Sequence, residues 1–429
     1  MSPAPRLKIL WVSHLVPYPP RAGVLLRSFN LLKQASRHHD LHLVSFIQQS
    51  WMETFFESVE QGVAEAEREL GCFCRLRGWS PVPSDQSGRI GQLSLAVRSL
   101  LSWNCYTVNW LQSADMERKL VELMQEGGWN LVHFDTISLA PYRTIFNGVP
   151  ATLGHHNIES HMLHRRASQE ANLVRRTYYR LEAHRLERYE KLVASQFDLH
   201  ITCSRLDSER LDALVPGLAV TDVSNGVDCE FFRRSDAAGN ERAGPFDGRG
   251  HDLLFVGTMD WYPNAAAIDF FLESVWPRLL DRRPDLTFGI VGSNPSIRLR
   301  QAAKATQGVT VHGYVEDVRP YLAGAGVYVC PIRDGGGTKL KILDALAMEC
   351  CVVAHPVACE GIAVCDGETV RLATEPEQFV ETILELLDRP TQQRQMGAAG
   401  RALVQQQYSY ESLGRRLVDL WNFVASPQA

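Results

Sequence analysis

Short apolar runs alternate with longer stretches of helical periodicity along the first half of the chain. The short runs lie at 8–13, 41–47, 130–134, 151–155 and 199–203, and apolar residues recur at helical spacing over 24–36. Short apolar runs bounded by polar residues predict buried strands, whereas a period of 3.6 residues predicts helices with one buried face. Their alternation is typical of βαβ units, so we predict a parallel sheet covered by helices.

A polar, glycine-rich stretch interrupts this alternation at 236–251, where no buried element is expected. Predicted strands then follow at 253–257, 288–292, 309–313, 327–331 and 352–355, with helices at 265–281 and 339–348. We therefore predict an α/β protein with two doubly wound domains, 1–235 and 252–405, joined by a linker at 236–251. In the last segment, 406–429, a helix at 410–424 has Leu413, Leu417, Leu420 and Phe423 on one face, and we expect it to pack back on the first domain.

Composition narrows the class of protein. The chain has 429 residues, 45% of them hydrophobic, and a net charge of −5 with acidic and basic residues interspersed. That charge gives no reason to expect a nucleic-acid partner. No apolar stretch reaches membrane-spanning length and no signal peptide is recognisable, which predicts a cytoplasmic location. The ten cysteines form no C-x-x-C pair, so we expect buried, reduced thiols.

The strongest chemical signal is a glycine loop between a predicted strand at 327–331 and a predicted helix. The loop reads Asp334-Gly335-Gly336-Gly337-Thr338-Lys339. Glycines let the backbone approach an anion, and the positive end of the following helix favours a phosphate there. Lys339 and Lys341 add mobile positive charge, and Asp344 shares a helix face with Lys341 and could accept hydrogen bonds from a ribose. The alternative for a glycine triplet alone is a surface turn, and the loop matches neither the Walker A nor the dinucleotide motif.

Several segments together resemble the retaining GT-B glycosyltransferases of family 4, particularly a branch tied to bacterial exopolysaccharide and exosortase-associated gene clusters. The segments lie at 17–20, 23, 27–29, 156–159, 224–228, 255–264, 288–292, 311–321 and 343–347. The resemblance implies two Rossmann-like domains facing a central cleft. It also implies transfer of a sugar from a nucleoside diphosphate sugar to an acceptor hydroxyl, with retention of configuration. No D-x-D sequence occurs, so neither a metal nor another cofactor is expected.

The resemblance also implies a donor site in the second domain. Its expected residues are Gly257, Asn264, Tyr314, Asp334, Gly335, Gly336, Gly337, Thr338, Lys339, Lys341, Asp344 and Gly361. The chain departs from the family at two positions. It has Asp344 where the family usually has glutamate, and Gly336, eight residues earlier, where the family usually has an acid. It also has Glu349 in a turn where φ is often positive, which costs on the order of 1 kcal/mol. Trp261 and Tyr314 suit either ligand contact or plain packing.

On the acceptor side, polar residues follow a predicted strand at 151–155. We expect Gly23, His156, Asn157 and Glu159 to face the acceptor. The expected catalytic residues are His156, Lys341 and Asp344. A histidine at a strand end is also often purely structural. His14 and His133 are weaker candidates of the same kind.

Arginines are frequent on the helical stretch after Glu159. They could dock the protein on the inner membrane face or bind a polyprenyl-phosphate acceptor, although a solvated helix with internal ion pairs is favoured. The expected acceptor is a glycan, a lipid-linked saccharide or a small molecule. Two other functions stay open: a nucleotide-sugar epimerase of the same fold, and a catalytically weak sugar-nucleotide-binding protein.

Overall fold

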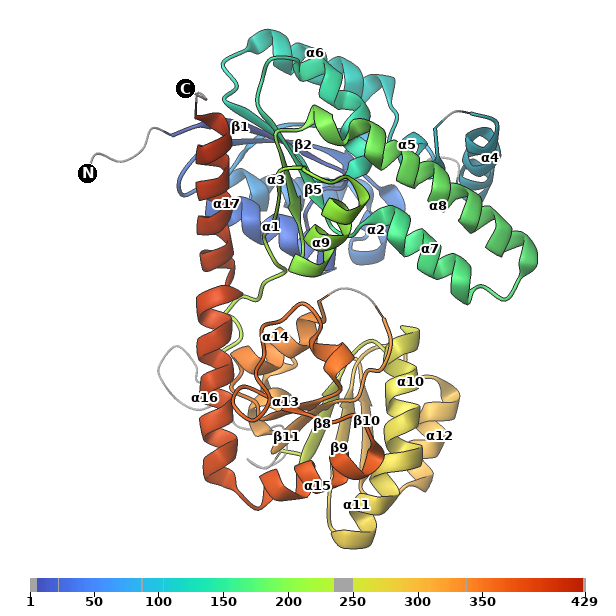
Figure 1. Cartoon of the computed structure of the whole chain (residues 1–429), viewed down its shortest axis with the longest axis vertical. Helices are drawn as coiled ribbons and strands as arrows, with labels where there is room; N and C mark the ends of the chain where they lie inside the picture. The colour runs from blue at the N-terminus through green and yellow to red at the C-terminus, as the bar shows by residue number, and fades with distance from the viewer. Residues whose placement is uncertain are drawn as a thin grey trace. The chain divides into compact units, whose positions relative to one another are not determined.

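The computed structural model describes residues 6–21, 23–85, 88–102, 104–234, 250–335 and 338–426, without the side chains of 88–90 and 92. Two compact units make up the chain (Figure 1). One consists of Met1–Ser224 and Leu413–Ala429, and the other of Asn225–Ser412. Most of the predicted linker, 236–251, lies outside the described residues, and the predicted domain limits stay predictions.

The first unit is built on a seven-stranded sheet in which every neighbouring pair is parallel. The strand order is β3-β2-β1-β4-β5-β6-β7. The strands are β1 (Lys8–Ser13), β2 (Asp40–Ile47), β3 (Arg75–Pro81), β4 (Leu131–Phe134), β5 (Ala151–His155), β6 (Leu199–Thr202) and β7 (Val220–Asp222). All residues of β4, β5 and β6 are buried, as expected for the interior of a parallel sheet.

Helices connect these strands and cover the sheet. They are α1 (Gly23–Ala35), α2 (Gln49–Phe55), α3 (Val59–Gly71), α4 (Gly88–Leu101), α5 (Tyr106–Asn109), α6 (Ala114–Glu126), α7 (Glu159–Gln169), α8 (Leu173–Val193) and α9 (Arg205–Leu214), with 3₁₀ turns at Ile137–Phe146 and Ala194–Gln196. The last helix, α17 (Tyr410–Ala425), adds Trp421 to the core of this unit. The Trp421 ring meets the Trp11 ring edge to face at 5.8 Å.

The second unit contains a six-stranded parallel sheet with the order β10-β9-β8-β11-β12-β13. The strands are β8 (Leu253–Val256), β9 (Phe288–Val291), β10 (Val309–Gly313), β11 (Val327–Cys330), β12 (Val352–Ala354) and β13 (Arg371–Leu372). The order reverses between β8 and β11, so the loops after these strands flank the switch point where open α/β sheets bind ligands.

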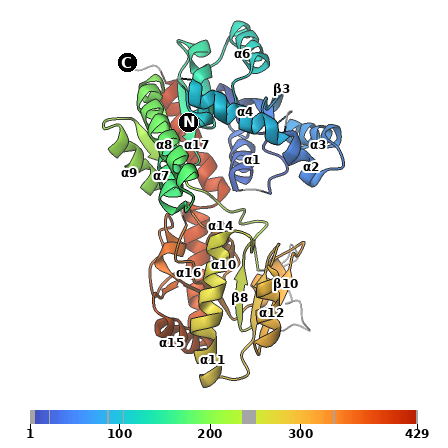
Figure 2. The ribbon, with the colours of Figure 1, turned by 90° about the vertical axis from the view of Figure 1, so that its right-hand side faces the viewer.

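Its helices are α10 (Tyr262–Phe270), α11 (Trp276–Arg282), α12 (Ile297–Ala305), α13 (Arg319–Gly324), α14 (Leu340–Ala347), α15 (Pro376–Leu387) and α16 (Pro390–Gln407), with a 3₁₀ turn at Pro356–Cys359. A π-helical turn, Phe271–Val275, joins α10 and α11 into one continuous rod (Figure 2). That turn packs Phe271 against Phe288 in the core, with the centres of the two rings 4.9 Å apart. The two predicted doubly wound parallel sheets are thus confirmed.

Two details of the sequence prediction can be compared with the structure. Glu349 has a φ of 57°, which confirms the positive backbone angle expected in that turn. The expectation of buried thiols is wrong for Cys72 and Cys365, which are exposed. None of the described helices combines the length and the apolar character needed to cross a membrane.

Candidate functional site

A partly buried lysine marks the carboxyl edge of the second sheet. Lys341, in the first turn of α14, donates a hydrogen bond from Nζ to Oδ1 of Asn264 at the start of α10. The Asn264 amide is itself fixed, because Nδ2 donates to the Thr258 carbonyl at 2.7 Å. The same Nζ lies 4.8 Å from the centre of the Phe255 ring and 5.7 Å from that of Trp261. Residues of α14, α10 and β8 therefore fix the Lys341 ammonium beside the end of β8.

Gly257 provides the room for this cation. A Cβ atom at position 257 would lie 2.5 Å from Nζ of Lys341 and 2.8 Å from Nδ2 of Asn264. Both distances are below van der Waals contact, so any side chain here would displace one of the two groups. Gly257 and Asn264, which the family resemblance implied, and Lys341, which the glycine loop also indicated, are thus neighbours.

The glycine loop begins with an interlocked set of contacts. The Asp334 carboxylate accepts from the Gly335 amide at 2.6 Å and from the Tyr262 hydroxyl at 3.2 Å. Lys339 is only 4% exposed and donates from Nζ to the Gly335 carbonyl at 2.8 Å. The expectation that Lys339 is a mobile charge is therefore wrong, since this lysine shapes the loop. Gly335 itself has a φ of 105°, which favours glycine.

The hydroxyl of Thr338 has no hydrogen-bond partner among the described residues. Its Oγ1 atom is buried. A buried hydroxyl without a partner costs free energy unless something satisfies it. Gly336 and Gly337, which precede it, lie outside the described residues.

Burial perturbs both titratable groups of α14. It lowers the pKa of Lys341 to about 8, and the nearby Lys339 adds to this effect. Burial also raises the pKa of Asp344 to about 7, against the opposing effect of Lys341. Groups with pKa values moved toward neutrality are more frequent at functional sites than elsewhere.

Two other predicted donor residues follow other strands of the same sheet. Tyr314 comes after β10 and is 70% exposed. Gly361 comes after β12 and has a φ of 79°.

The first unit has a cavity of about 490 Å³, lined by polar and apolar residues, at the carboxyl ends of β1 and β5. Its lining includes the predicted residues His156, Asn157 and Glu159, together with the weaker candidate His14. Of the predicted acceptor-side residues, Gly23 does not line the cavity, although its neighbour Val24 does. His133 lies instead in the core, where Nδ1 is 2.8 Å from the Thr152 hydroxyl and burial lowers the pKa of its imidazole to about 4.

Asp135 lies next to both histidines that line this cavity, and sequence reasoning missed it. Its carboxylate is 3.3 Å from Nε2 of His156 and 3.4 Å from Nδ1 of His14. The hydroxyls of Ser13 and Ser28 donate to the same carboxylate at 3.2 and 2.9 Å. The available signal was an acid directly after a fully buried strand, β4, which a parallel sheet places at its carboxyl edge.

Charge and burial act in opposite directions in this cluster. Burial would raise the pKa of Asp135, but the imidazoles of His156 and His14 hold that pKa well below its usual value. Burial lowers the pKa of His156, so its ring is expected to be neutral at pH 7 despite the carboxylate. Burial also raises the pKa of Glu159. The result is a neutral imidazole with Nε2 3.3 Å from an ionised carboxylate. A neutral imidazole can donate a hydrogen bond from one ring nitrogen and accept one at the other.

In the described ranges, two groups of side chains have ligand atoms close enough together to bind a metal ion. One is His14, Asp135 and His156, and the other is His164, His184 and Glu187. Within each group the ligand atoms lie within 4.8 Å of one another. Neither group belongs to the donor-side residues around Lys341.

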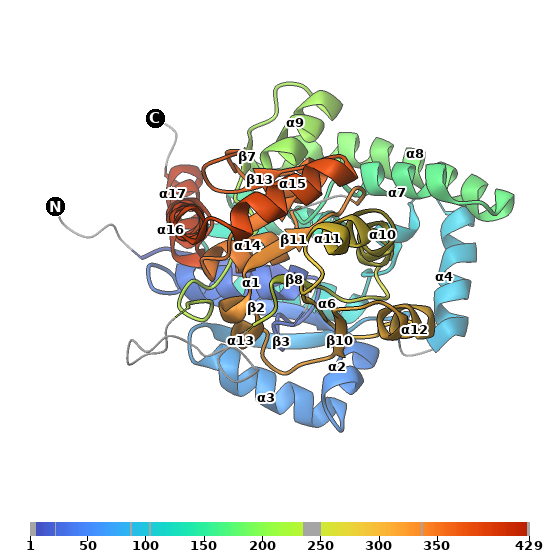
Figure 3. The same cartoon turned by 90° about the horizontal axis from the view of Figure 1, so that it is seen from below.

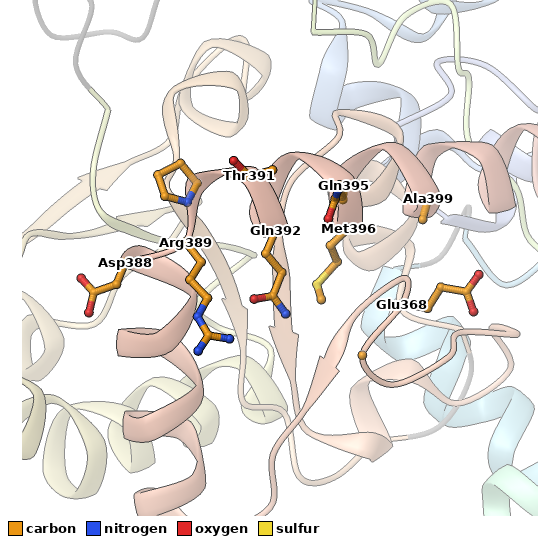
Figure 4. Close-up of a pocket in the computed structure, with 10 residues that line it drawn as sticks. Glu368, Asp388, Arg389, Thr391, Gln392, Gln395, Met396 and Ala399 are labelled. Atoms are coloured by element: carbon orange, nitrogen blue, oxygen red, sulfur yellow. The ribbon is translucent and has the colours of Figure 1, made fainter.

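A larger cavity of about 770 Å³ lies elsewhere in the second unit (Figure 4). Residues before β13, such as Glu368, and residues at the start of α16, such as Gln392 and Met396, line it. None of the predicted site residues does so. Its lining comes from segments where β13 begins and α15 has ended, at the opposite edge from Lys341, so we do not assign the donor to it.

The arrangement of two parallel Rossmann-like sheets is the GT-B fold. A solved structure of Anabaena Alr3699/HepE in complex with UDP aligns with 97% of this chain over 100% of its own, with a TM-score of 0.64 and 14% identity. A sucrose-phosphate synthase from Thermosynechococcus elongatus aligns with 98% of this chain over 100% of its own, with a TM-score of 0.63 and 18% identity. At these identities the likeness shows the fold alone.

The sequence of the second unit carries the family signal. Residues 250–389 match the family described as "Glycosyl transferases group 1". A GDP-mannose-dependent monoacylated alpha-(1-6)-phosphatidylinositol monomannoside mannosyltransferase from Corynebacterium glutamicum is 34% identical over 35% of this chain. That alignment spans 42% of the relative's length, less than half of it. A GDP-mannose-dependent alpha-(1-6)-phosphatidylinositol monomannoside mannosyltransferase from Mycolicibacterium smegmatis is 23% identical over 73% of this chain and 88% of its own length.

Proposed function

We propose that the protein is a glycosyltransferase that moves a hexosyl group from a nucleoside diphosphate sugar to an acceptor hydroxyl, with retention of configuration and without a metal. The observation that carries this proposal is the Lys341 ammonium, held by Asn264 over Gly257 within the segment that matches the group 1 glycosyl transferases. A fixed cation at the carboxyl edge of a Rossmann-like sheet suits a diphosphate.

In this proposal the residues of α14 and its preceding loop bind the donor. Lys341 pairs with the diphosphate, and the buried Thr338 hydroxyl donates to a phosphate oxygen. Asp344, one turn further along α14, accepts hydrogen bonds from the ribose hydroxyls. Lys339 and Asp334 keep the loop in shape, Gly361 lies near the donor sugar, and Tyr314 lies near the nucleobase.

The reaction breaks the bond between the anomeric carbon and the β-phosphate oxygen. Negative charge then grows on the leaving diphosphate, and Lys341 stabilises that charge more strongly than the charge of the intact donor. The acceptor oxygen forms the new bond to the anomeric carbon on the same face, and its proton passes to an oxygen of the leaving phosphate. His156, oriented by Asp135, contacts the reacting sugar by a hydrogen bond from its imidazole.

For the substrates we propose a GDP- or UDP-hexose as donor and a lipid-linked saccharide as acceptor. The relatives from Corynebacterium and Mycolicibacterium are named for GDP-mannose and for phosphatidylinositol mannosides. A role in exopolysaccharide synthesis, a cytoplasmic location and a peripheral contact with the inner membrane face are part of the same proposal.

The test has two stages. UDP- and GDP-sugars are first screened for thermal stabilisation of the full chain, and each stabilising sugar is then incubated with lipid-linked and soluble acceptors. We expect mass analysis to find an acceptor that gains one hexosyl unit and an equal amount of nucleoside diphosphate. An epimerised sugar nucleotide without transfer, or stabilisation without turnover for every acceptor, would contradict the proposal.

A further inference from the structure

An exposed apolar stripe runs along α4 in the first unit. Leu93 is 68% exposed, Val97 50%, Leu100 42% and Leu101 86%. Their spacing of four, three and one residues places them on one face of the helix. A helix of a globular protein normally turns such a face to the core, so this stripe lacks the cover that the pattern calls for.

The hairpin of α7 and α8 lies beside α4 and adds exposed apolar residues and positive charge (Figures 1 and 3). At its tip Leu173 is 66% exposed and Val174 79%. Over residues 162–181 the chain has one acidic residue, Glu170, and five arginines, Arg165, Arg166, Arg175, Arg176 and Arg180. Within the described ranges, no ion pair involves the guanidinium of Arg175 or Arg180.

Hydrogen bonds fix the segment after α4 to α8. Arg185 of α8 donates to the Asn104 carbonyl at 3.0 Å, and Glu182 accepts from the Tyr106 amide at 2.6 Å. The chain between α4 and α5, and the start of α5, are thereby tied to the middle of α8. We call the exposed residues Leu93, Val97, Leu100, Leu101, Leu173, Val174, Arg175 and Arg180 the α4/α8 surface.

We propose that the α4/α8 surface docks the protein on an anionic lipid bilayer. The apolar stripe would enter the boundary between headgroups and acyl chains while the arginines meet lipid phosphates. Charge argues against a second copy of this chain as the occupant. A symmetric interface would set this surface against the same surface of the other copy, and the α4/α8 surface contains arginines but no acidic residue to balance them.

The position of the surface beside the first unit's cavity gives the docking a consequence. The short helix α5 follows α4 in the chain, and Tyr106, Thr107 and Trp110 from this segment line the cavity that holds His156. A lipid-linked saccharide could then leave its hydrocarbon in the bilayer at α4 and place its sugar in the cavity. This consequence rests on the proposed function, and the docking assigns residues to the membrane contact proposed there.

Vesicle co-sedimentation of the full chain tests the docking without any turnover. The probes are vesicles of phosphatidylcholine alone and vesicles in which roughly one third of the lipid is phosphatidylglycerol. We expect binding to the anionic vesicles that weakens at high salt. Arg175→Glu with Arg180→Glu should weaken it by about 30-fold or more, since each arginine near such a surface changes the partition by about fivefold.

The apolar contribution needs a second variant and matched controls. Replacing Leu93, Val97 and Leu101 by Ser should weaken binding about tenfold or more, because their apolar area no longer leaves water. Ile297→Ser, at a residue 75% exposed in the second unit, and Arg205→Glu with Arg298→Glu should bind as the parent does. Circular dichroism and melting curves verify that each variant is folded.

Three outcomes would overturn the docking. They are equal binding to neutral and anionic vesicles, no binding to either, and unchanged binding of both α4/α8 variants. A fall from dimer to monomer in light scattering of the apolar variant, with vesicle binding unchanged, would identify the surface as an interface between copies instead. If docking holds but no acceptor, lipid-linked or soluble, receives a hexosyl unit, the proposed transfer fails and the docking stands.

Discussion

The Lys341 ammonium fills the space that a side chain at Gly257 would need, since a Cβ there would lie 2.5 Å from Nζ. Because Nζ is the end of a flexible side chain, it can move away at little cost to the fold. We expect Gly257→Ala to shift the lysine and weaken UDP or GDP binding by about tenfold, the loss of one charge-assisted hydrogen bond. Calorimetry measures the affinity, and the melting temperature should fall only slightly. Parent-like affinity in Gly257→Ala would contradict the placement of Lys341 in the donor site.

Nucleotide binding should depend on pH through Lys341. Its pKa of about 8 means that the ammonium is charged below that pH and neutral above it. A bound diphosphate favours the charged form, so affinity for UDP or GDP should fall by up to about tenfold per pH unit above pH 8. Lys341→Arg is the matched control, because a guanidinium stays charged and should flatten the profile. The same decline in both proteins would assign the pH dependence to another group.

The turn after α14 holds Glu349 at a φ of 57°, where residues with a Cβ are strained. Glu349→Ala and Glu349→Gly both remove the contact of the Glu349 carboxylate with Arg401 at 3.6 Å. Only the glycine variant also relieves the backbone. We expect the free energy of unfolding of Glu349→Gly to be about 1 kcal/mol higher than that of Glu349→Ala. Denaturant titration measures both values. Equal stabilities would show that the turn carries no such strain.

The acceptor-side cluster makes a prediction about turnover. His156→Ala should lower kcat at saturating donor by about 100-fold, as expected when a positioned hydrogen-bonding group is lost from the transition state. Donor affinity should change little. The exposed His38 of the first unit provides the control, and His38→Ala should keep the parent rate. A His156→Ala enzyme with full kcat would remove this residue from the catalytic machinery.

Local pattern predicted most of the fold because the central strands are short apolar runs. The strands that the pattern missed, β3, β7 and β13, lie toward the sheet edges, where polar residues are tolerated. The edge strand β3 contains Arg75, Arg77 and Gly78. Such strands are defined by their neighbour in the sheet more than by their own sequence.

The family resemblance indicated Gly257 and Asn264, and the glycine-loop motif indicated Lys341, but neither could show that the three residues are neighbours. It also missed Asp135, because one acid after a strand acquires meaning only when His14 and His156, from two other strands, converge on it. In the same way the burial of Lys339 depends on the Gly335 carbonyl that the folded loop turns toward it. Contacts between segments distant in sequence are a property of tertiary structure, which local pattern does not encode.

Calorimetric titration of UDP and GDP into the full chain tests the donor site most directly. Lys341→Ala removes the cation proposed to pair with the diphosphate, and Asp344→Ala removes the acceptor proposed for the ribose. We expect Lys341→Ala to weaken binding by about tenfold to 100-fold, Asp344→Ala by several-fold, and the exposed Lys304→Ala control not at all. Melting curves should show that all three variants keep the fold. Unchanged affinity in both α14 variants would contradict the assignment of the donor diphosphate to this helix.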